Sequence, residues 1–301
     1  MRIVSVLPSA TEIVCGLGAG SELVGRSEEC DFPPEVAKLP VVMRARTLDR
    51  DAPSRAIDAR VRASLAAGES LYELDLPLLA SLGPELLLTQ DLCRVCSVTD
   101  QEVASACDAA GVAPRVLSLS PTRLSEVWDS IERIAEALGR PEAGARLAAE
   151  RRARTPPPNG PGGPPVAVVE WLDPPILSGL WTPELVQSGG GTPWGIAPGD
   201  LARTTDWGAI ERDPPEALIL SPCAFDVART RRELRSSELG RFLAGLPIPR
   251  GVWLADEACF SRPGPRLVEG RELVRQLLGG APPQLDVEVE RWPSGAREAL
   301  A

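Results

Sequence analysis

The sequence predicts an α/β protein with two small parallel-sheet lobes joined by a long connecting helix. Two observations carry this prediction. Short apolar runs alternate with helical patterns in two separate regions of the chain, and such alternation is typical of strands that pair in parallel through crossover helices. A strongly periodic helical stretch lies between the two regions. The 301 residues leave room for about two domains.

Residues 1–120 carry the pattern of the first lobe. Residues 3–6 predict a strand, and Ser9 with Glu12 forms a capping box that opens a helix, in which Ser9 caps the first free N–H groups. Closely spaced glycines after position 15 end that helix. Further strands are expected at 23–25, 85–89 and 115–119, and further helices at 53–67, 76–82 and 99–110.

Residues 121–154 form the connecting helical segment. Leu124, Val127 and Ile131 begin an apolar face with helical spacing, and helical character continues to about residue 154. We expect one long element that bends at Pro141. Residues 155–165 are rich in Pro and Gly, which predicts a linker or surface loop.

The second lobe is expected at 166–280. Residues 281–301 mix Pro and charged residues with little periodicity, which predicts a tail that is partly ordered at best. The pattern of the lobe places strands at 166–169, 217–220 and 251–254, and helices at 183–188, 207–211, 227–239 and 265–278.

The composition excludes several functions. The chain has no His, which rules out Ser-His-Asp and Cys-His catalysis as well as His ligands to a metal, and we do not expect an enzyme. Its 42 acidic against 32 basic residues give a net charge of −10, which argues against nucleic acid and anionic membranes as partners. No apolar run is long enough for membrane insertion, and the N-terminal residues lack a signal-peptide pattern, so the sequence as written predicts a cytoplasmic protein.

The segments around the predicted strand ends concentrate polar, Cys and aromatic residues. Ligands of open parallel sheets collect beyond the carboxyl ends of strands, so we expect a small-molecule site in a cleft between the lobes. Trp171 and Trp181 can stack on a flat, largely apolar ligand, although packing between the lobes explains them equally well. The candidate ligand-binding residues are Pro8, Ser9, Asp91, Cys93, Glu170, Trp171, Trp181, Phe260 and Arg262.

Five of the seven cysteines fall in these strand-end segments. Cys93-x-x-Cys96 can place two thiols on one small turn, as zinc, iron–sulfur and redox sites require. Together with Cys30 and Cys223, the pair can form a four-thiolate site that binds a metal or an iron–sulfur cluster. Reactive or ligand-contacting thiols are one alternative, and small apolar side chains that fill the cleft floor are another.

Several segments together resemble a known family, the vitamin B12- and iron-siderophore-type substrate-binding proteins of ABC importers. They are residues 2–12 (Arg-Ile-Val-Ser-Val-Leu-Pro-Ser-Ala-Thr-Glu), 23–27 with 30–33, 82–88 and 260–266. Residues 90–96 and 170–175 are most similar to its cobalamin-binding branch. The resemblance covers roughly residues 1–280. It implies a helical-backbone fold that holds a corrinoid such as cobalamin, or a metal chelate, in its cleft, and a periplasmic location if an N-terminal signal was removed.

The sequence also departs from that family. Members that dock on an importer carry a Glu near the start of one helix in each lobe, and the matching positions here are Pro77 and Gly208, which speaks against an ABC permease as partner. Related sequences often have His near positions 28–30 and 180–181, where this chain has none. The alternative function is that of a cytoplasmic relative that binds a metal or iron–sulfur cluster, or performs thiol chemistry, through its cysteines.

Overall fold

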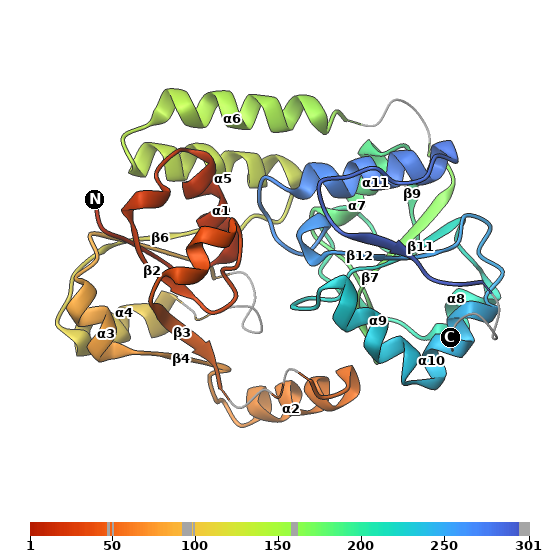
Figure 1. Ribbon diagram of the computed structural model, residues 1–301, viewed down its shortest axis with the longest axis horizontal. Coiled ribbons are helices and arrows are strands. Elements are labelled where there is room, and N and C mark those ends of the chain that lie inside the picture. Colours follow the sequence, from red (N-terminus) through yellow and green to blue (C-terminus); the bar gives the residue numbers. More distant parts are fainter. Residues whose placement is uncertain (47–48, 50, 92–97, 99, 158–161, 295–301) are drawn as a thin grey trace. The chain divides into compact units, whose positions relative to one another are not determined.

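The computed structural model describes residues 1–301 except 47–48, 50, 92–97, 99, 158–161 and 295–301 (Figure 1). The chain forms two compact units, each with its own parallel sheet and covering helices, as the sequence predicts. The first unit comprises Met1–Ala52, Ala56–Pro121 and Glu126–Arg151, and the second comprises Pro53–Arg55, Thr122–Ser125 and Arg152–Ala301.

The first unit is built on a six-stranded sheet of order β4-β3-β2-β1-β5-β6, in which only the edge strand β4 is antiparallel. The central strands β1 and β5 are fully buried, which explains their continuous apolar runs. The strands are β1 (Ile3–Ser5), β2 (Leu23–Ser27), β3 (Val41–Ala45), β4 (Tyr72–Leu74), β5 (Leu86–Thr89) and β6 (Arg115–Ser118).

The first helix of this unit does not start as the sequence predicts. Leu7 is the N-cap residue, and Pro8 takes the first helical position, where its missing N–H costs nothing. Ser9 therefore lies inside the first turn and caps no N–H group, so the predicted capping box is wrong. The helices are α1 (Pro8–Gly16), α2 (Ser54–Ala66), α3 (Leu76–Leu82) and α4 (Asp100–Ala110), with short 3₁₀ turns η1 (Gly20–Glu22) and η2 (Pro34–Lys38).

The connecting segment folds into two helices instead of one long bent helix. They are α5 (Leu124–Ala137) and α6 (Pro141–Arg154), and Figure 1 shows them lying side by side. Gly139 adopts φ 68°, a left-handed conformation that reverses the chain at little cost for glycine. At Gly144 a Cβ atom would lie 2.3 Å from the Cβ of Ala135, so glycine is what lets the two helices approach this closely.

The second unit has a sheet of order β10-β8-β7-β11-β12-β13, with β9 paired to β7. Strands β7, β9, β11 and β12 pair in parallel, β8 pairs antiparallel with both β7 and β10, and β13 pairs antiparallel with β12. The strands are β7 (Pro165–Leu172), β8 (Pro175–Leu177), β9 (Thr192–Pro193), β10 (Arg203–Thr204), β11 (Ala217–Leu220), β12 (Val252–Ala255) and β13 (Val289–Arg291). The helices are α7 (Thr182–Ser188), α8 (Trp207–Arg212), α9 (Val227–Arg235), α10 (Glu238–Gly245), the 3₁₀ turn η3 (Glu257–Cys259) and α11 (Leu267–Gly279).

The segment predicted as a tail is in part a component of the second sheet. Strand β13 pairs with β12, and Trp292 next to it is 2% exposed and donates its indole N–H to the carbonyl of Gly240 at 3.1 Å. The second unit therefore extends to Trp292 at least. Among the helices of the described chain, none combines the length and the apolar character that crossing a membrane requires.

Candidate functional site

At the carboxyl end of β1, a buried cluster of small polar side chains lies beneath the first turn of α1. The hydroxyl oxygen of Thr11 is 2.9 Å from Ser5 Oγ and 3.1 Å from the sulfur of Cys30. The Cys30 thiol is 1% exposed and donates to the carbonyl of Ser5 at 3.7 Å. Cys30 thus fits the packing alternative, since its sulfur is enclosed by hydrogen-bonding groups of its own unit.

Other hydroxyls near this strand end have no partner. Within the described part of the chain, Ser9 Oγ, Thr89 Oγ1 and Ser118 Oγ are buried and make no hydrogen bond. Thr89 and Ser118 are paired residues of β5 and β6, so their side chains share one face of the sheet. Buried hydroxyls are usually satisfied, which makes this group of three a candidate for contact with a ligand.

The remaining predicted residues of the first unit lie close to the same strand ends. Pro8 is partly exposed at the first position of α1. Asp91 is exposed, and its backbone N–H donates to Ser120 Oγ at 3.3 Å. Cys93 and Cys96 lie outside the described residues.

In the second unit, the predicted residues Glu170 and Trp171 belong to a strand and do not follow one. The sequence ends the strand at residue 169, but β7 continues to Leu172 because it pairs with the antiparallel β8. Glu170 accepts a hydrogen bond from Ser178 Oγ at 2.8 Å. Trp171 is half-buried, and its ring lies 5.2 Å from that of Phe225 at an interplanar angle of 48°. Phe225 lies in the strand-end segment 221–225, but the sequence did not single it out as a ligand-binding residue.

The Trp171 indole N–H is buried and has no acceptor among the described residues. A buried Trp N–H usually finds a partner, so this donor resembles the orphaned hydroxyls of the first unit. The second unit thus offers an aromatic side chain with an unused donor at the end of its central strand.

The loop that carries Phe225 is fixed by a charged pair. Arg262 is 8% exposed and forms an ion pair and hydrogen bond with one carboxylate oxygen of Glu257. The other oxygen accepts the backbone N–H of Ala224 at 2.6 Å. Ala224 adopts φ 62°, an unfavourable conformation for a residue with a Cβ, and this hydrogen bond helps to hold it. Arg262, which the sequence predicts as a ligand contact, thus supports this loop through Glu257.

Trp181 and Phe260 lie inside the second unit. Trp181 is 5% exposed and donates its indole N–H to the carbonyl of Phe260 at 2.7 Å, and the Phe260 ring is fully buried. This arrangement fits a packing role within the second unit. The alternative that the sequence leaves open for Trp181 is packing between the lobes.

The cysteines of the described residues give no support to a metal site. No group of three or more His, Cys, Asp or Glu side chains in the described ranges is arranged to hold a metal ion. Burial raises the pKa of the Cys259 thiol, with the nearby Asp256 acting in the same direction, and burial likewise raises the pKa of Cys107. These two side chains therefore remain protonated thiols at neutral pH, which makes them poor nucleophiles and metal ligands. The backbone N–H of Cys223 donates to the carbonyl of Glu170 at 3.0 Å.

The two helices that were compared with importer-docking helices each begin with an exposed acid. Asp75 is the N-cap of α3 and accepts the N–H of Leu78 at 3.0 Å, and Asp206 is the N-cap of α8 and accepts the N–H of Ala209 at 2.7 Å. Acids are thus present just before Pro77 and Gly208. The sequence argument against a permease partner is not supported.

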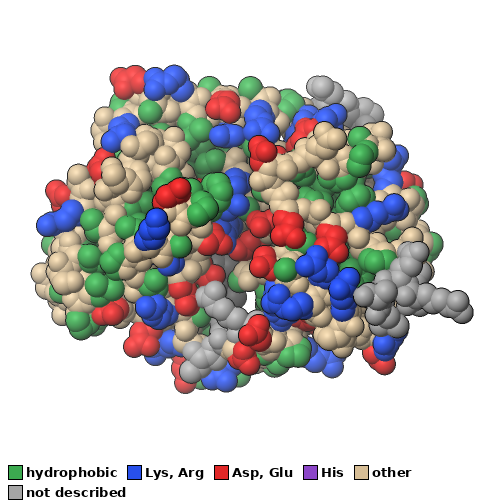
Figure 2. Space-filling model, viewed as in Figure 1, with side chains coloured by type: hydrophobic (Ala, Val, Ile, Leu, Met, Phe, Trp, Pro, Cys, Tyr) green, Lys and Arg blue, Asp and Glu red, His purple; other side chains and the backbone are tan. Residues whose placement is uncertain are grey.

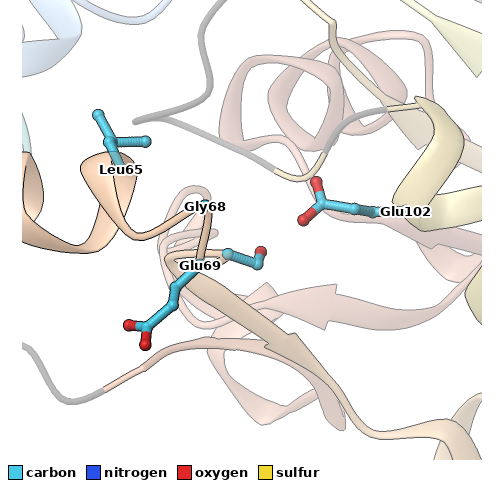
Figure 3. Close-up of a pocket in the computed structure, with 5 residues that line it drawn as sticks. Leu65, Gly68, Glu69 and Glu102 are labelled. Carbon is cyan, nitrogen blue, oxygen red and sulfur yellow. The ribbon is translucent and has the colours of Figure 1, made fainter.

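Two adjoining hollows lie in the first unit, beside β4 and α4. The smaller holds about 30 Å³, roughly one water molecule, and Figure 3 shows Leu65, Gly68 and Glu69 from the end of α2 together with Glu102 of α4 around it. The larger is an open groove of about 660 Å³ with a mixed lining that includes Tyr72 and Leu74. None of the predicted site residues lines either hollow.

The surface has no single large apolar area on the face that Figure 2 presents, where charged and apolar side chains are interspersed. Basic side chains gather over α9, which carries four Arg residues. The large hydrophobic side chains that are exposed in the described chain come from separate segments: Met1, Phe32, Leu65, Val116 and Leu201.

Solved structures share this fold over almost the whole chain. The periplasmic heme-binding protein RhuT from Roseiflexus sp. RS-1 matches with a TM-score of 0.65 and 21% identity, over 93% of this chain and 99% of that one. A periplasmic heme-binding protein from Pseudomonas aeruginosa matches with a TM-score of 0.69 and 18% identity, over 98% and 99%. The vitamin B12-binding protein BtuF of Vibrio cholerae matches with a TM-score of 0.60 and 18% identity, over 94% and 98%.

By sequence, no protein-family model and no curated protein matches the chain. At identities of 18–21%, the structural matches speak for the fold. The chain has the α/β fold of the class III, helical-backbone periplasmic binding proteins.

Proposed function

We propose that this protein is the substrate-binding component of an ABC importer and that it binds a corrinoid or another metal–tetrapyrrole or metal chelate. The observation that carries the proposal is the shared fold: structures named as binding proteins for heme and for vitamin B12 match this chain over more than nine-tenths of both lengths. A binding protein that serves an importer works on the outer side of the cytoplasmic membrane.

The residues at the strand ends support this proposal. Trp171 supplies an aromatic face and an indole N–H without an acceptor in the described chain, and such a group suits a flat macrocycle with polar edges. The buried hydroxyls of Ser9 and Thr89 are available to hydrogen-bond polar substituents. Arg262, through Glu257, supports the loop of Phe225, which lies against Trp171, while Trp181 and Phe260 pack inside the second unit.

The absence of His limits how side chains can bind the metal of the ligand. Without imidazole, no side-chain nitrogen of the usual kind can ligate the metal of the bound molecule. We therefore expect recognition by shape, stacking and hydrogen bonds, and a bound cobalamin that keeps its own axial ligands. Its visible spectrum should stay close to that of free cobalamin.

Calorimetry with cobalamin, cobinamide, heme and a ferric siderophore tests the proposal. We expect one of the four to bind with a dissociation constant of about 1 μM or tighter, and Trp171→Ala to weaken that binding by about tenfold or more. Trp253→Phe is the control, because the Trp253 indole already donates to the carbonyl of Arg250 at 2.7 Å. Absence of binding for all four ligands would refute the proposal.

The importer partner has its own test. Asp75 and Asp206 give each unit an exposed acid at a helix start, which suits docking on basic residues of a permease. We expect Asp75→Asn with Asp206→Asn to abolish ligand-dependent stimulation of transport in vesicles that contain the permease, with ligand affinity unchanged. Full transport by the double variant would argue against this docking.

A further inference from the structure

Within the second unit, Trp171 contacts Phe225, and Phe225 contacts Arg229. The Phe225 ring lies against Trp171 on one side, and the guanidinium carbon of Arg229 lies 4.3 Å from the Phe225 ring centroid. Phe225 is 3% exposed and contacts both groups, so a displacement of Arg229 changes how the ring packs against Trp171. Arg229 is thus part of the support on which the candidate ligand contact rests.

Arg229 also forms a buried ion pair with Glu233, one turn further along α9. The shortest N···O distance is 3.0 Å, and the two side chains are 11% and 9% exposed. A charge in such a place is costly unless it is paired, so each partner holds the other where it is. The position of the guanidinium on Phe225 therefore depends on the Glu233 carboxylate.

The same carboxylate binds the first residue of α2. The backbone N–H of Ser54 donates to Glu233 at 2.9 Å, and the Ser54 hydroxyl donates to the same oxygen. Ser54 is fully buried and is grouped with the second unit. A carboxylate at this place satisfies a free N–H group and is favoured by the helix dipole. Glu233 thus acts as a cap for α2 that is supplied by a distant part of the chain.

We propose that the Arg229–Glu233 pair is a positioning element that couples the ligand contact Trp171 to Ser54, the first residue of α2. Its importance for binding rests on the proposed function, because Trp171 is the contact that it orients. The Arg229 guanidinium lies against Phe225, which contacts Trp171. The Glu233 carboxylate pairs with this guanidinium and also accepts two hydrogen bonds from Ser54. A ligand that contacts Trp171 therefore stabilises the hydrogen bonds of Ser54 to Glu233, and loss of these bonds loosens Trp171.

Two readouts on the ligand-free protein test the pair. The first is hydrogen exchange of the Ser54 amide at the start of α2, whose N–H donates to Glu233. The second is the fluorescence signal of Trp171, defined as the difference between each protein and the same protein with Trp171→Phe. We expect both Arg229→Met and Glu233→Gln to raise the exchange by about tenfold and to shift the Trp171 signal. Arg232→Met, an exposed neighbour on α9, is the matched control and should change neither readout.

Two further variants separate the halves of the proposal. Arg229→Lys keeps the ion pair but loses the flat guanidinium face, so it should shift the Trp171 signal and leave the start of α2 protected. Ser54→Ala removes one hydrogen bond far from the rings and should still move the Trp171 signal. The proposal is overturned if Ser54→Ala leaves the Trp171 signal as in the wild type, or if Glu233→Gln changes only one readout.

A separate measurement adds a ligand to the protein. When a ligand from the calorimetry binds, it should slow exchange at the start of α2 in the wild type by about threefold or more, and Arg229→Met should abolish that slowing. If no ligand binds, the proposed function fails while the ligand-free readouts still decide on the coupling.

Discussion

The strand ends of the two units are built in opposite ways. In the first unit they carry small hydroxyls, and three of them have no hydrogen-bond partner in the described chain. In the second unit they carry large aromatic and charged groups that contact one another, as in the tilted ring pair of Trp171 and Phe225 and the ion pair of Glu257 with Arg262. The two sheets nevertheless share the same parallel arrangement around their central strands.

This difference gives the two groups of strand-end residues different energetics. Unsatisfied hydroxyls cost stability in the free protein, and a ligand that satisfies them recovers that cost as affinity. The contact between Trp171 and Phe225 is already formed in the free protein and offers a surface in position, although the Trp171 N–H lacks an acceptor in the described chain. We therefore expect substitutions in the second unit to act mainly on stability, whereas removal of the orphaned hydroxyls of the first unit should stabilise the free protein.

The largest expected effect tests the strand-end contacts of the second unit. Phe225→Ala removes a buried ring between Trp171 and Arg229, and we expect it to lower the free energy of unfolding by about 3 kcal/mol or more. Leu201→Ala is the control, because Leu201 in the same unit is 71% exposed and should change stability by less than about 0.5 kcal/mol. Urea unfolding measures both. Equal effects of the two substitutions would show that the ring pair is not a stabilising feature.

An intermediate effect distinguishes satisfied from orphaned hydroxyls within the first unit. Thr11 and Thr89 are both fully buried, but only Thr11 has hydrogen-bonding neighbours. We expect Thr11→Val to destabilise the protein by about 1.5 kcal/mol and Thr89→Val to stabilise it by about 1 kcal/mol. The same unfolding measurement applies. A destabilising Thr89→Val would mean that this hydroxyl is satisfied in solution.

The smallest expected effect lies on α11, away from both strand ends, and depends on pH. A hydrogen bond from Arg275 lowers the pKa of Glu272 from its ordinary 4.5 to about 2. A depressed pKa in the folded state means that the interaction stabilises the protein above about pH 4.5 and is lost as pH falls toward 2. Because Arg275 is 54% exposed, we expect Glu272→Gln to cost only about 1 kcal/mol at pH 7. Unfolding at pH 7 and pH 3 should show the difference shrink, and a constant difference would contradict the ion-pair origin.

Sequence patterns predicted the elements whose signals are local. The helix expected at 76–82 is found over those residues, and that expected at 53–67 is found as Ser54–Ala66, because helical spacing and flanking Pro and Gly residues are properties of the segment itself. The fold class followed from the alternation of such segments. Pro8 was placed next to a strand end for the same reason, whereas Trp171, predicted to follow a strand, lies within β7.

Features that depend on distant partners were missed. The capping box at Ser9 failed because Pro8 occupies the first helical position, which shifts the helix start by two residues. Strand β7 extends past residue 169 only because β8 folds back on it. The role of Arg229 could not be predicted, since nothing in its neighbourhood along the chain shows that Phe225 lies against Trp171 or that Glu233 binds Ser54.

Strand β13 gives the second sheet a particular order of assembly during synthesis. Its partner β12 is made first, and α11 follows before residues 289–291 leave the ribosome. Until then the outer edge of β12 exposes unpaired backbone groups, which other nascent chains can extend into an intermolecular sheet. A chain shortened before Val289 would keep that edge open permanently, and we expect it to aggregate although every strand of the central parallel sheet is still present.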